Sequence, residues 1–463
     1  MKRQVVARGP ALMHLKRTAL VIAGGIGIIL TSVFARQTAD HSITLRIEAD
    51  AVSATDAMEK SSAAFTRDTG IQVVVEKFGY QSSMERAVED LASPEGRYDI
   101  VIQNNDALGK FASQGSILSI DELEKMSGVR ADFEGDLFPN AWHGLSWYQG
   151  VRYGYPLAAN TMFVLYRKDL LDSSEQKQAF HARYGYDLIP PQDWKQYRDL
   201  AEFFTRPDQK FYGTLVQGKR FPAVWFEWLN FAFSFGGGVM EKEHSWEYGP
   251  VIINSPDTIA ATDYYNSLKQ FSPPGVTNFT WDDAVGQMRD GHIFMCLLWS
   301  DALFHVVDPK VSAVVGKIGY SPLPSGKAGR VAQIAGSTYM VSRRSKHPKE
   351  AFQLELWMLR RDNQIQQELA GGASARKSVY QDPRVLELPY ALADSQSLAV
   401  ARNMIDTSPE TPQIAETIEI AISEVIADKS NPAEALDWAA VELNKSLGSK
   451  APLKYPAFQD SRK

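Results

Sequence analysis

"YDIVIQNND", residues 98 to 106, tells the most about how this chain folds. Its centre, residues 100–102, is a short apolar run typical of a buried strand. The run ends in four polar residues, Gln103, Asn104, Asn105 and Asp106. A buried strand that ends in amide and carboxylate groups indicates a polar site at its carboxyl end.

Two more strands and two helices precede this stretch. The alternation of apolar and polar residues in 43–48 predicts a strand with one solvated face, and the apolar run 71–75 predicts a second strand. Helices are expected over about 54–68 and about 82–92. Strands and helices that alternate in this way form a parallel sheet covered by helices, and ligands bind such sheets beyond the carboxyl ends of the strands.

A second stretch of the same kind, "HIFMCLLWSD", spans residues 292 to 301. Its apolar part predicts another buried strand, which ends in Trp299, Ser300 and Asp301. An indole ring can cover the apolar C–H face of a sugar while hydroxyl and carboxylate groups bind the sugar hydroxyls. The sequence therefore predicts that this strand and the strand at 100–102 open into one polar, aromatic cleft.

The rest of the chain continues the α/β pattern without a repeat or a low-complexity linker. Residues 162–166 predict a strand, and Asp193 is expected to cap a helix. Proline in the first turn marks three later helices, at Pro256, Pro348 and Pro432. A chain of 463 residues is long enough for two lobes. Their boundaries are expected at short crossovers near Pro156, near Ile318 and after a helix that ends about Arg361.

The charge of the chain argues against nucleic acid or an anionic membrane as a partner. The formal net charge is -6, and the first 35 residues hold five basic residues and no acidic one. Without these five positive charges the net charge of -6 becomes -11. An acidic protein is repelled by the phosphate groups of both partners.

The N-terminus is expected to be an export signal. Basic residues precede an uncharged run, 18–35, that closes with Val33, Phe34 and Ala35, which places small residues where a signal peptidase acts. We expect cleavage near Ala35 and a location in the periplasm. An uncleaved anchor is the alternative, because the run is at the short edge of a membrane span.

Cys296 is the only cysteine of the chain. It lies within the apolar run 294–298, so we expect a buried apolar residue rather than a reactive thiol.

Motifs for metal, phosphate and nucleophilic catalysis are absent. The eight histidines are scattered, without the spacing of paired metal ligands. The stretch "SPLPSGKAG" has Ser321 where a phosphate loop needs glycine and Ala328 where it needs a hydroxyl. No G-x-S-x-G motif occurs. No metal, no cofactor and no catalytic residue are therefore expected, although the many carboxylates leave a two-carboxylate glycoside hydrolase open.

Six aromatic residues crowd the eleven positions 225–235, and three tryptophans follow them by residue 299. They are Trp225, Phe226, Trp228, Phe231, Phe233 and Phe235, followed by Trp246, Trp281 and Trp299. The core of a lobe is one interpretation of these rings, and a surface that stacks on sugars is the other.

Eight segments occur in a characteristic order along the chain. They are "AAFTRDTGIQVVVEKF", "YDIVIQNNDALGKFASQGSILSIDEL", "GYPLAANTMFVLYRKDLL", "WLNFAFSFGGG", "DGHIFMCLLWSD", "KIGYSPLPSG", "AGSTYMVSRRSKHPKEAFQL" and "GGASARKSVYQDP". In this order and spacing, the chain after the export signal resembles the extracellular sugar-binding proteins of ABC importers, the group that includes maltose-binding protein.

The resemblance implies a two-lobed periplasmic-binding-protein fold of class α/β, in which each lobe is a mainly parallel sheet flanked by helices and crossover hinge strands join the lobes. With 1–35 as signal peptide, residues 41–157 and 318–361 would form the first lobe, and residues 158–317 and 362–463 the second. The resemblance also implies closure of the lobes around the ligand and docking of a monomer onto a membrane permease.

The resemblance further implies which residues bind the ligand. Together with Asp301 from the second stretch, they are Tyr80, Gln103, Asn104, Asp106, Asn160, Trp225, Phe226, Trp299, Gly336, Ser337, Tyr339 and Arg376. Ser374 stands where the family commonly has proline. Several rings usual in maltodextrin binders have no counterpart, so a mono- or disaccharide or a sugar alcohol is expected rather than a long glucan.

The leading hypothesis is thus a periplasmic receptor that captures a small carbohydrate or polyol for an ABC importer and makes or breaks no bond. One alternative is an exported glycoside hydrolase. The other is a two-lobed receptor for an organic phosphate, such as glycerol 3-phosphate, held by Arg376.

Overall fold

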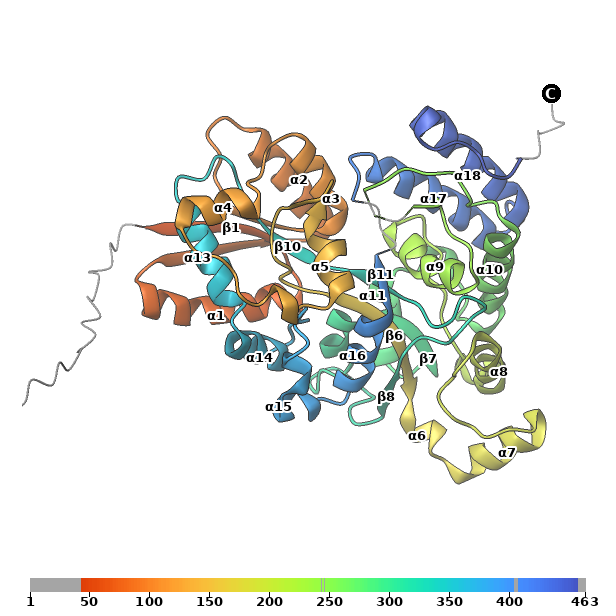
Figure 1. The fold of residues 1–463 in the computed structure, drawn as a ribbon. Coiled ribbons are helices and arrows are strands. Elements are labelled where there is room, and N and C mark those ends of the chain that lie inside the picture. Colours follow the sequence, from red (N-terminus) through yellow and green to blue (C-terminus); the bar gives the residue numbers. More distant parts are fainter. Residues whose placement is uncertain (1–42, 243, 245, 404–406, 457–463) are drawn as a thin grey trace, which may run out of the picture. The chain divides into compact units, whose positions relative to one another are not determined.

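The computed structural model describes residues 43–242, 244, 246–403 and 407–456 (Figure 1). All of them belong to one contact unit, Asp40–Lys463. The expected export signal at 1–35 lies outside the described residues. Among those described, no helix is both long enough and apolar enough to cross a bilayer.

The first sheet has the strand order β10-β3-β1-β2. Its strands are β1 (Thr44–Asp50), β2 (Gln72–Phe78), β3 (Ile100–Asn104) and β10 (Ser337–Val341). β1 pairs in parallel with β2 and β3, while β10 pairs with β3 in antiparallel register. The helices α1 (Ser53–Thr69) and α2 (Tyr80–Ala92) connect the parallel strands, and α3 (Asn105–Ser113) follows β3. The parallel sheet expected from residues 43–102 is therefore confirmed, and β1 and β3 end at the same edge.

The second sheet is built around β6. Its strands are β6 (Asn160–Arg167), β7 (Met295–Trp299), β8 (Ile318–Ser321), β9 (Ala332–Ala335) and β11 (Ala401–Asn403). β6 pairs antiparallel with β7, β8 and β9, and only β11 and β9 pair in parallel. The α/β class is confirmed, but the expected mainly parallel pairing is wrong for this sheet.

Two of the crossovers that carry the chain between the sheets run side by side. In one of them, Gly336 alone separates β9 of the second sheet from β10 of the first. In the other, the backbone N–H groups of Leu157 and Ala158 both donate to the carbonyl oxygen of Ser337, at 2.8 and 3.2 Å. A Cβ at Gly336 would lie 2.0 Å from the Ala158 carbonyl oxygen, so only glycine allows this close approach.

The expected lobe boundaries differ from the observed sheets in two places. β8 and β9 belong to the second sheet, whereas residues from 318 onward were expected in the first lobe. Ile365 of α14 (Arg361–Leu369) packs in the same core as Leu45 of β1, whereas residues from 362 onward were expected in the second lobe. We therefore propose that the second crossing between the lobes lies at Gly336.

Helix starts and stops follow the expected local signals. The side chain of Asp193 accepts a hydrogen bond of 2.8 Å from the Gln196 backbone N–H at the start of α8 (Trp194–Phe204). Proline stands in the first turn of α10 (Pro256–Ser267), α13 (Pro348–Met358) and α18 (Pro432–Leu447). Gly70 ends α1 with a φ of 79°.

Helices cover both sheets and bury two large apolar cores. α13 packs against α4 (Ile120–Ser127) and α14 against α1, around the first sheet (Figure 1). α9 (Pro222–Ser234) packs against α10 and α17 (Thr411–Ile426), around the second. The remaining helices and strands are β4 (Trp147–Tyr148), β5 (Val151–Arg152), α5 (Pro139–Ser146), α6 (Lys168–Leu171), α7 (Ser174–Tyr184), α11 (Trp281–Arg289), α12 (Leu303–Val306), α15 (Pro383–Leu386) and α16 (Ala391–Val400).

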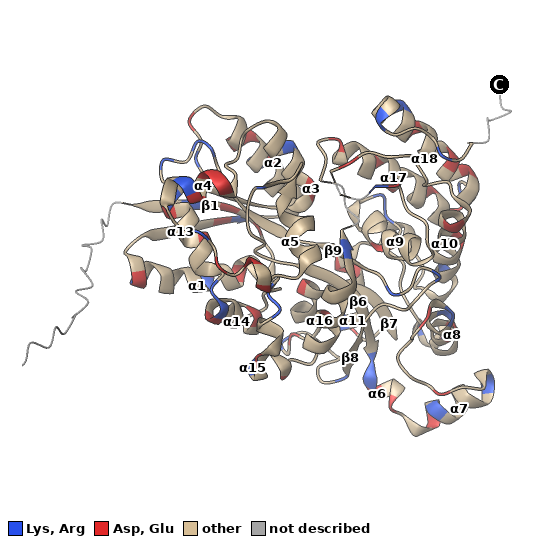
Figure 2. Ribbon diagram, viewed as in Figure 1, with Lys and Arg blue, Asp and Glu red and all other residues tan. Residues whose placement is uncertain are grey.

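Charged residues of both signs are interspersed along the ribbon (Figure 2). Nucleic-acid-binding proteins instead gather their basic residues on one face.

Candidate ligand-binding site

A cavity of about 500 Å³ is lined by residues that follow the strand ends of both sheets. It is lined by Asp50, Ala51, Val52, Ser53, Tyr80, Asn104, Asn105, Asp106, Asn160, Phe226, Trp281, Asp282, Val285, Arg289, Trp299, Asp301, Ala302, His305, Ala335 and Ser337. Sites for small molecules typically have volumes of roughly 300–1,000 Å³, apolar walls and a few polar groups that fix orientation. The cavity meets this description.

The first wall is the carboxyl edge of the parallel sheet. β1 ends at Asp50, and β3 runs into Asn104 and Asp106. Asn104 Nδ2 donates to Asp50 Oδ2 at 3.0 Å, and Tyr80 Oη donates to Asp106 Oδ2 at 3.0 Å. These bonds hold both carboxyl groups in place at the cavity.

The second wall comes from the antiparallel sheet. β7 ends at Trp299, beside the first residues of β6, so Asn160 and Asp301 come together. Asn160 Nδ2 donates to Asp301 Oδ2 at 3.2 Å. The Trp299 ring meets the Phe226 ring edge-on, with centroids 5.9 Å apart. This wall offers apolar rings beside amide and carboxylate oxygens.

Two contacts connect the walls of the cavity in this structure. Ser53 Oγ at the start of α1 donates to the Asp301 carbonyl oxygen at 3.3 Å. The rings of Tyr80 in α2 and Trp281 in α11 meet edge-on at 6.2 Å. Both walls therefore lie within reach of one small ligand.

The carboxyl groups of the cavity are hard to ionise. Burial, together with the neighbouring carboxylates of Asp106 and Asp301, raises the pKa of Asp50 to about 7. Burial raises the pKa of Asp301 to about 6, although His305 acts in the opposite direction. Burial also raises the pKa of Asp106. All three shifts have the same sign.

The raised pKa of Asp50 predicts a pH dependence of stability. The folded protein holds this proton more tightly than the unfolded chain does, so the stabilisation is full below about pH 4 and is lost as the pH rises toward about 7. In the variant Asp50→Asn, the free energy of unfolding should therefore fall less steeply between pH 4.5 and 7.5 than in the parent. Urea unfolding at several pH values without ligand measures the difference, which should reach a few kcal/mol (roughly, from a three-unit shift).

A matched control is Asp263→Asn, because Asp263 is exposed on α10 and lies outside the cavity. This variant should follow the pH profile of the parent protein. Parallel profiles for Asp50→Asn and the parent would contradict the raised pKa of Asp50.

Eight of the thirteen residues expected at the site line the cavity. They are Tyr80, Asn104, Asp106, Asn160, Phe226, Trp299, Asp301 and Ser337. The structure thus brings together the ends of both stretches, "YDIVIQNND" and "HIFMCLLWSD", as expected.

Gln103 and Tyr339 lie away from the cavity, inside the first sheet. Gln103 Nε2 donates to Glu48 Oε2 and to Ser83 Oγ, both at 2.7 Å. Tyr339 is fully buried in β10 and packs in the core. Side chains alternate along a strand, so Gln103 faces the opposite side from Asn104.

Arg376 also lies away from the cavity, and its guanidinium is already bound. Its Nε donates to Asp136 Oδ2 at 2.8 Å and its Nη1 to the Leu359 carbonyl oxygen at 2.6 Å. Phe133 packs against the same guanidinium at 5.1 Å. Arg376 therefore does not line the cavity, and the protein itself supplies partners for its guanidinium.

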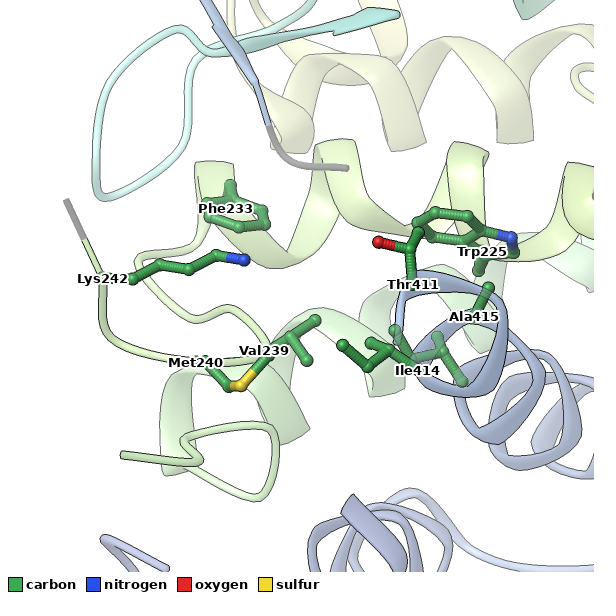
Figure 3. Close-up of a pocket in the computed structure, with 9 residues that line it drawn as sticks. Trp225, Phe233, Val239, Met240, Lys242, Thr411, Ile414 and Ala415 are labelled. Carbon is green, nitrogen blue, oxygen red and sulfur yellow. The ribbon is translucent and has the colours of Figure 1, made fainter. Parts of the chain in front are cut away.

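Trp225 and Gly336 lie next to the cavity without lining it. Trp225 packs 4.3 Å from Phe226, ring to ring, and faces Thr411 and Ile414 across a separate space of only about 10 Å³ (Figure 3). Gly336 lies between Ala335 and Ser337, which both line the cavity. Gly336 thus belongs to the crossover, and Trp225 packs against Phe226, which does line the cavity.

Several cavity residues escaped the sequence analysis. Asp50 follows the same rule as Asn104, since it ends the parallel strand beside β3, and the end of the 43–48 strand could have revealed it. Trp281 was noted only as one of many aromatic residues, and Asn105 was noted but not chosen. Arg289 reaches the cavity from α11, whose start is marked by the capping box of Thr280 and Asp283, and His305 reaches it from α12. Neither was chosen as a site residue.

No group of three or more His, Cys, Asp and Glu side chains among the described residues could hold a metal ion.

Sequence comparison finds relatives along almost the whole chain. A family model described as bacterial extracellular solute-binding protein matches residues 60–391. A probable ABC transporter-binding protein of Deinococcus radiodurans is 25% identical over 432 residues, which cover 90% of this chain and 97% of that protein. The mannitol-binding protein of Pseudomonas aeruginosa is 26% identical over 249 residues, about half of each chain (52% and 51%).

Comparison with solved structures finds the same fold. A solute-binding protein of an ABC transporter from Agrobacterium radiobacter, in complex with ribitol, has a TM-score of 0.75 and 24% identity, and the match covers 88% of this chain and 99% of that one. A maltose-bound protein of T. maritima has a TM-score of 0.72 and 22% identity, with 88% and 100% coverage. These likenesses confirm the two-lobed fold.

Proposed function

The chain belongs to the family of bacterial extracellular solute-binding proteins, and we propose that it captures a mono- or disaccharide or a sugar alcohol between its two lobes. One observation carries the proposal. A single cavity of about 500 Å³ is lined by aromatic rings and by amide and carboxyl groups from both sheets. Mannitol and ribitol, bound by two of the relatives, have the complementary chemistry.

Each kind of wall residue has a role in this capture. The rings of Trp299 and Phe226 cover the apolar C–H face of the ligand. The oxygens of Asp50, Asp106 and Asn160 accept hydrogen bonds from its hydroxyl groups. Hydroxyl groups of the ligand that donate to buried carboxyl and amide oxygens give specificity. An analogue that lacks one of these hydroxyl groups leaves a buried acceptor of the protein unpaired.

Binding and closure are coupled in this proposal. A ligand that touches Asn104 of the first wall and Trp299 of the second makes both sets of contacts only when the walls are together. Ligand therefore shifts the population toward the closed state. A permease of an ABC importer recognises that state, and the protein acts as an exported monomer in the periplasm, with no chemical step of its own.

The organic-phosphate alternative has little support. Arg376, its expected anchor, is bound to Asp136 and the Leu359 carbonyl. The cavity instead presents four carboxyl groups, Asp50, Asp106, Asp282 and Asp301, which repel a phosphate ester.

A thermal-shift screen tests the proposal. The protein is heated with ribitol, mannitol, tagatose, maltose or glycerol 3-phosphate, each in large excess. A ligand at one hundred times its Kd should add about 2.7 kcal/mol to the free energy of unfolding. We expect a neutral polyol or sugar to stabilise the protein and glycerol 3-phosphate to leave it unchanged.

The opposite pattern, stabilisation by glycerol 3-phosphate alone, would favour the anion receptor. Release of products from labelled oligosaccharides, with loss of release in Asp301→Asn, would favour a glycoside hydrolase.

A further inference from the structure

Three carboxyl groups meet at the cavity from three separate strand ends. Asp50 ends β1, Asp106 lies in the first turn of α3 after β3, and Asp301 follows β7 of the other sheet. All three line the cavity, and a fourth carboxyl group, Asp282 of α11, lines it as well. The first three are close enough that the charges of Asp106 and Asp301 both act on Asp50.

Several oxygens in this group have no hydrogen-bond donor. Oδ1 of Asp50, Oδ1 of Asp106 and Oδ1 of Asn105 are buried and accept no hydrogen bond from the described residues. The side chains of Asp50 and Asn105 are only 4% and 0% exposed. A buried acceptor without a donor is costly, and each belongs to a side chain that lines the cavity. The residues around the cavity thus hold more hydrogen-bond acceptors than the protein's own donors satisfy.

The positive side chains of the cavity do not neutralise this group. Arg289 directs its Nε to Asp290 Oδ1, at 2.9 Å, and that carboxylate is exposed at the surface. His305 acts on Asp301, yet neither His305 nor Arg289 donates a hydrogen bond to Asp50 or Asp106 in the described structure. The cavity thus holds more carboxyl groups than positively charged side chains.

Aromatic rings surround the same space. Tyr80 and Trp281 meet edge-on at 6.2 Å, and Phe226 and Trp299 at 5.9 Å, and all four residues line the cavity. The faces of aromatic rings attract cations, and rings combined with carboxylates are typical of sites for organic ammonium groups. A hydroxyl group uses only the acceptors, whereas an ammonium group uses acceptors, charge and ring faces together.

We propose that the cavity prefers an amino sugar or an amino-substituted polyol to its neutral counterpart, with the ammonium group seated among Asp50, Asp106 and Asp301. This inference rests on the proposed function and narrows its ligand class. It also implies that sugar acids and sugar phosphates are rejected, because they add negative charge beside the same carboxyl groups.

Two matched series of compounds test the preference. One is D-glucitol, D-glucamine and D-gluconate, which differ only at C1. The other is D-glucose, D-glucosamine and D-glucuronate, in which the amine stands at C2 and the carboxylate at C6. Isothermal titration calorimetry at pH 7 measures each affinity. We expect the amine to bind at least tenfold more tightly than the neutral member and the acid at least tenfold more weakly.

A proton count gives an independent readout. An ammonium group favours the ionised form of the carboxyl groups beside it, so binding of the amine should release protons to the buffer. The binding enthalpy of the amine should then vary with the ionisation enthalpy of the buffer, while that of the neutral member should vary less.

Variants locate the effect. Asp301→Asn should reduce the affinity ratio of amine to neutral ligand by at least fivefold. Asp263→Asn removes a carboxylate from an exposed position of α10 outside the cavity and should leave the ratio unchanged. An unchanged ratio in Asp301→Asn would overturn the seating of the ammonium group at this cluster.

The two proposals fail in different ways. If neutral sugars or polyols bind and neither amine binds more tightly, the preference for amines is overturned and the proposed function stands. If no neutral or charged member of either series binds and no neutral compound of the thermal screen does, both are overturned.

Discussion

Replacing Trp299 with alanine is expected to weaken ligand binding by about 1–3 kcal/mol, or roughly 5- to 150-fold in Kd. Trp299 ends β7, lines the cavity and is held edge-on by Phe226 at 5.9 Å. Its loss removes the ring that we assign to the apolar face of the ligand. Calorimetric titration of the variant with the stabilising compound of the thermal screen measures the change.

Two further variants separate stacking from packing. Trp299 is also part of the core of the second sheet, so Trp299→Ala should lose stability as well. Trp299→Leu keeps much of the apolar volume but has no ring face, and it should lose affinity while remaining folded. Trp438→Ala removes a tryptophan that is 39% exposed on α18, outside the cavity, and should bind like the parent. Unchanged affinity in both Trp299 variants would mean that Trp299 is only a core residue.

The variant Gly109→Ala is expected to weaken ligand binding by about 1–3 kcal/mol, as much as Trp299→Ala, although Gly109 does not line the cavity. Gly109 lies in α3, and a Cβ there would lie 1.6 Å from the Thr407 carbonyl oxygen. α3 packs in the core beside the first sheet, while Thr407 leads into α17, which packs in the core of the second. Gly109→Ala therefore separates two surfaces that touch when the cavity is closed.

The expected signature of Gly109→Ala is a loss of affinity without a matching loss of stability. Alanine favours a helix by about 1 kcal/mol over glycine, so α3 itself should not weaken. If binding requires closure, the apparent Kd rises in proportion as the closed state is depopulated. Titration calorimetry and unfolding of the ligand-free variant measure the two quantities.

The matched control is Gly135→Ala, since a Cβ at Gly135 would meet nothing within 4 Å. It should bind and unfold like the parent. Parent-like affinity in Gly109→Ala would show that the contact between α3 and Thr407 has no part in closure.

Local signals were sufficient for most elements of the fold. Asp193 caps α8, Pro256 begins α10 and Gly70 ends α1, because caps, first-turn prolines and terminal glycines act within one turn of chain. The apolar runs around β3 and β7 mark strands buried on both faces.

Long-range pairing was not available from such signals. The second sheet is largely antiparallel because β6 is flanked by β7, β8 and β9, which come from distant parts of the chain. The crossover at Gly336 depends on the close approach of Ala158, a contact that adjacent residues do not encode.

The contrast between local signals and long-range contacts also explains which site residues were predicted. Asn104, Asp106, Trp299 and Asp301 follow directly from strand ends, and the structure brings them to one cavity. Arg376 was assigned through the resemblance, and its partner Asp136 is 240 residues away in the chain. Trp281 reaches the cavity from the start of α11, where a helix N-terminus gives no sign of what lies opposite.

Hydrogen exchange with and without ligand shows whether one small ligand holds the walls of both sheets together. If it does, the bound ligand must slow amide exchange in both walls. We predict slower exchange in peptides that cover α3 after β3 (residues 103–113) and in peptides that cover the turn after β7 (residues 299–306). A compound that stabilises the protein but protects only one of these segments, or neither, would contradict the account.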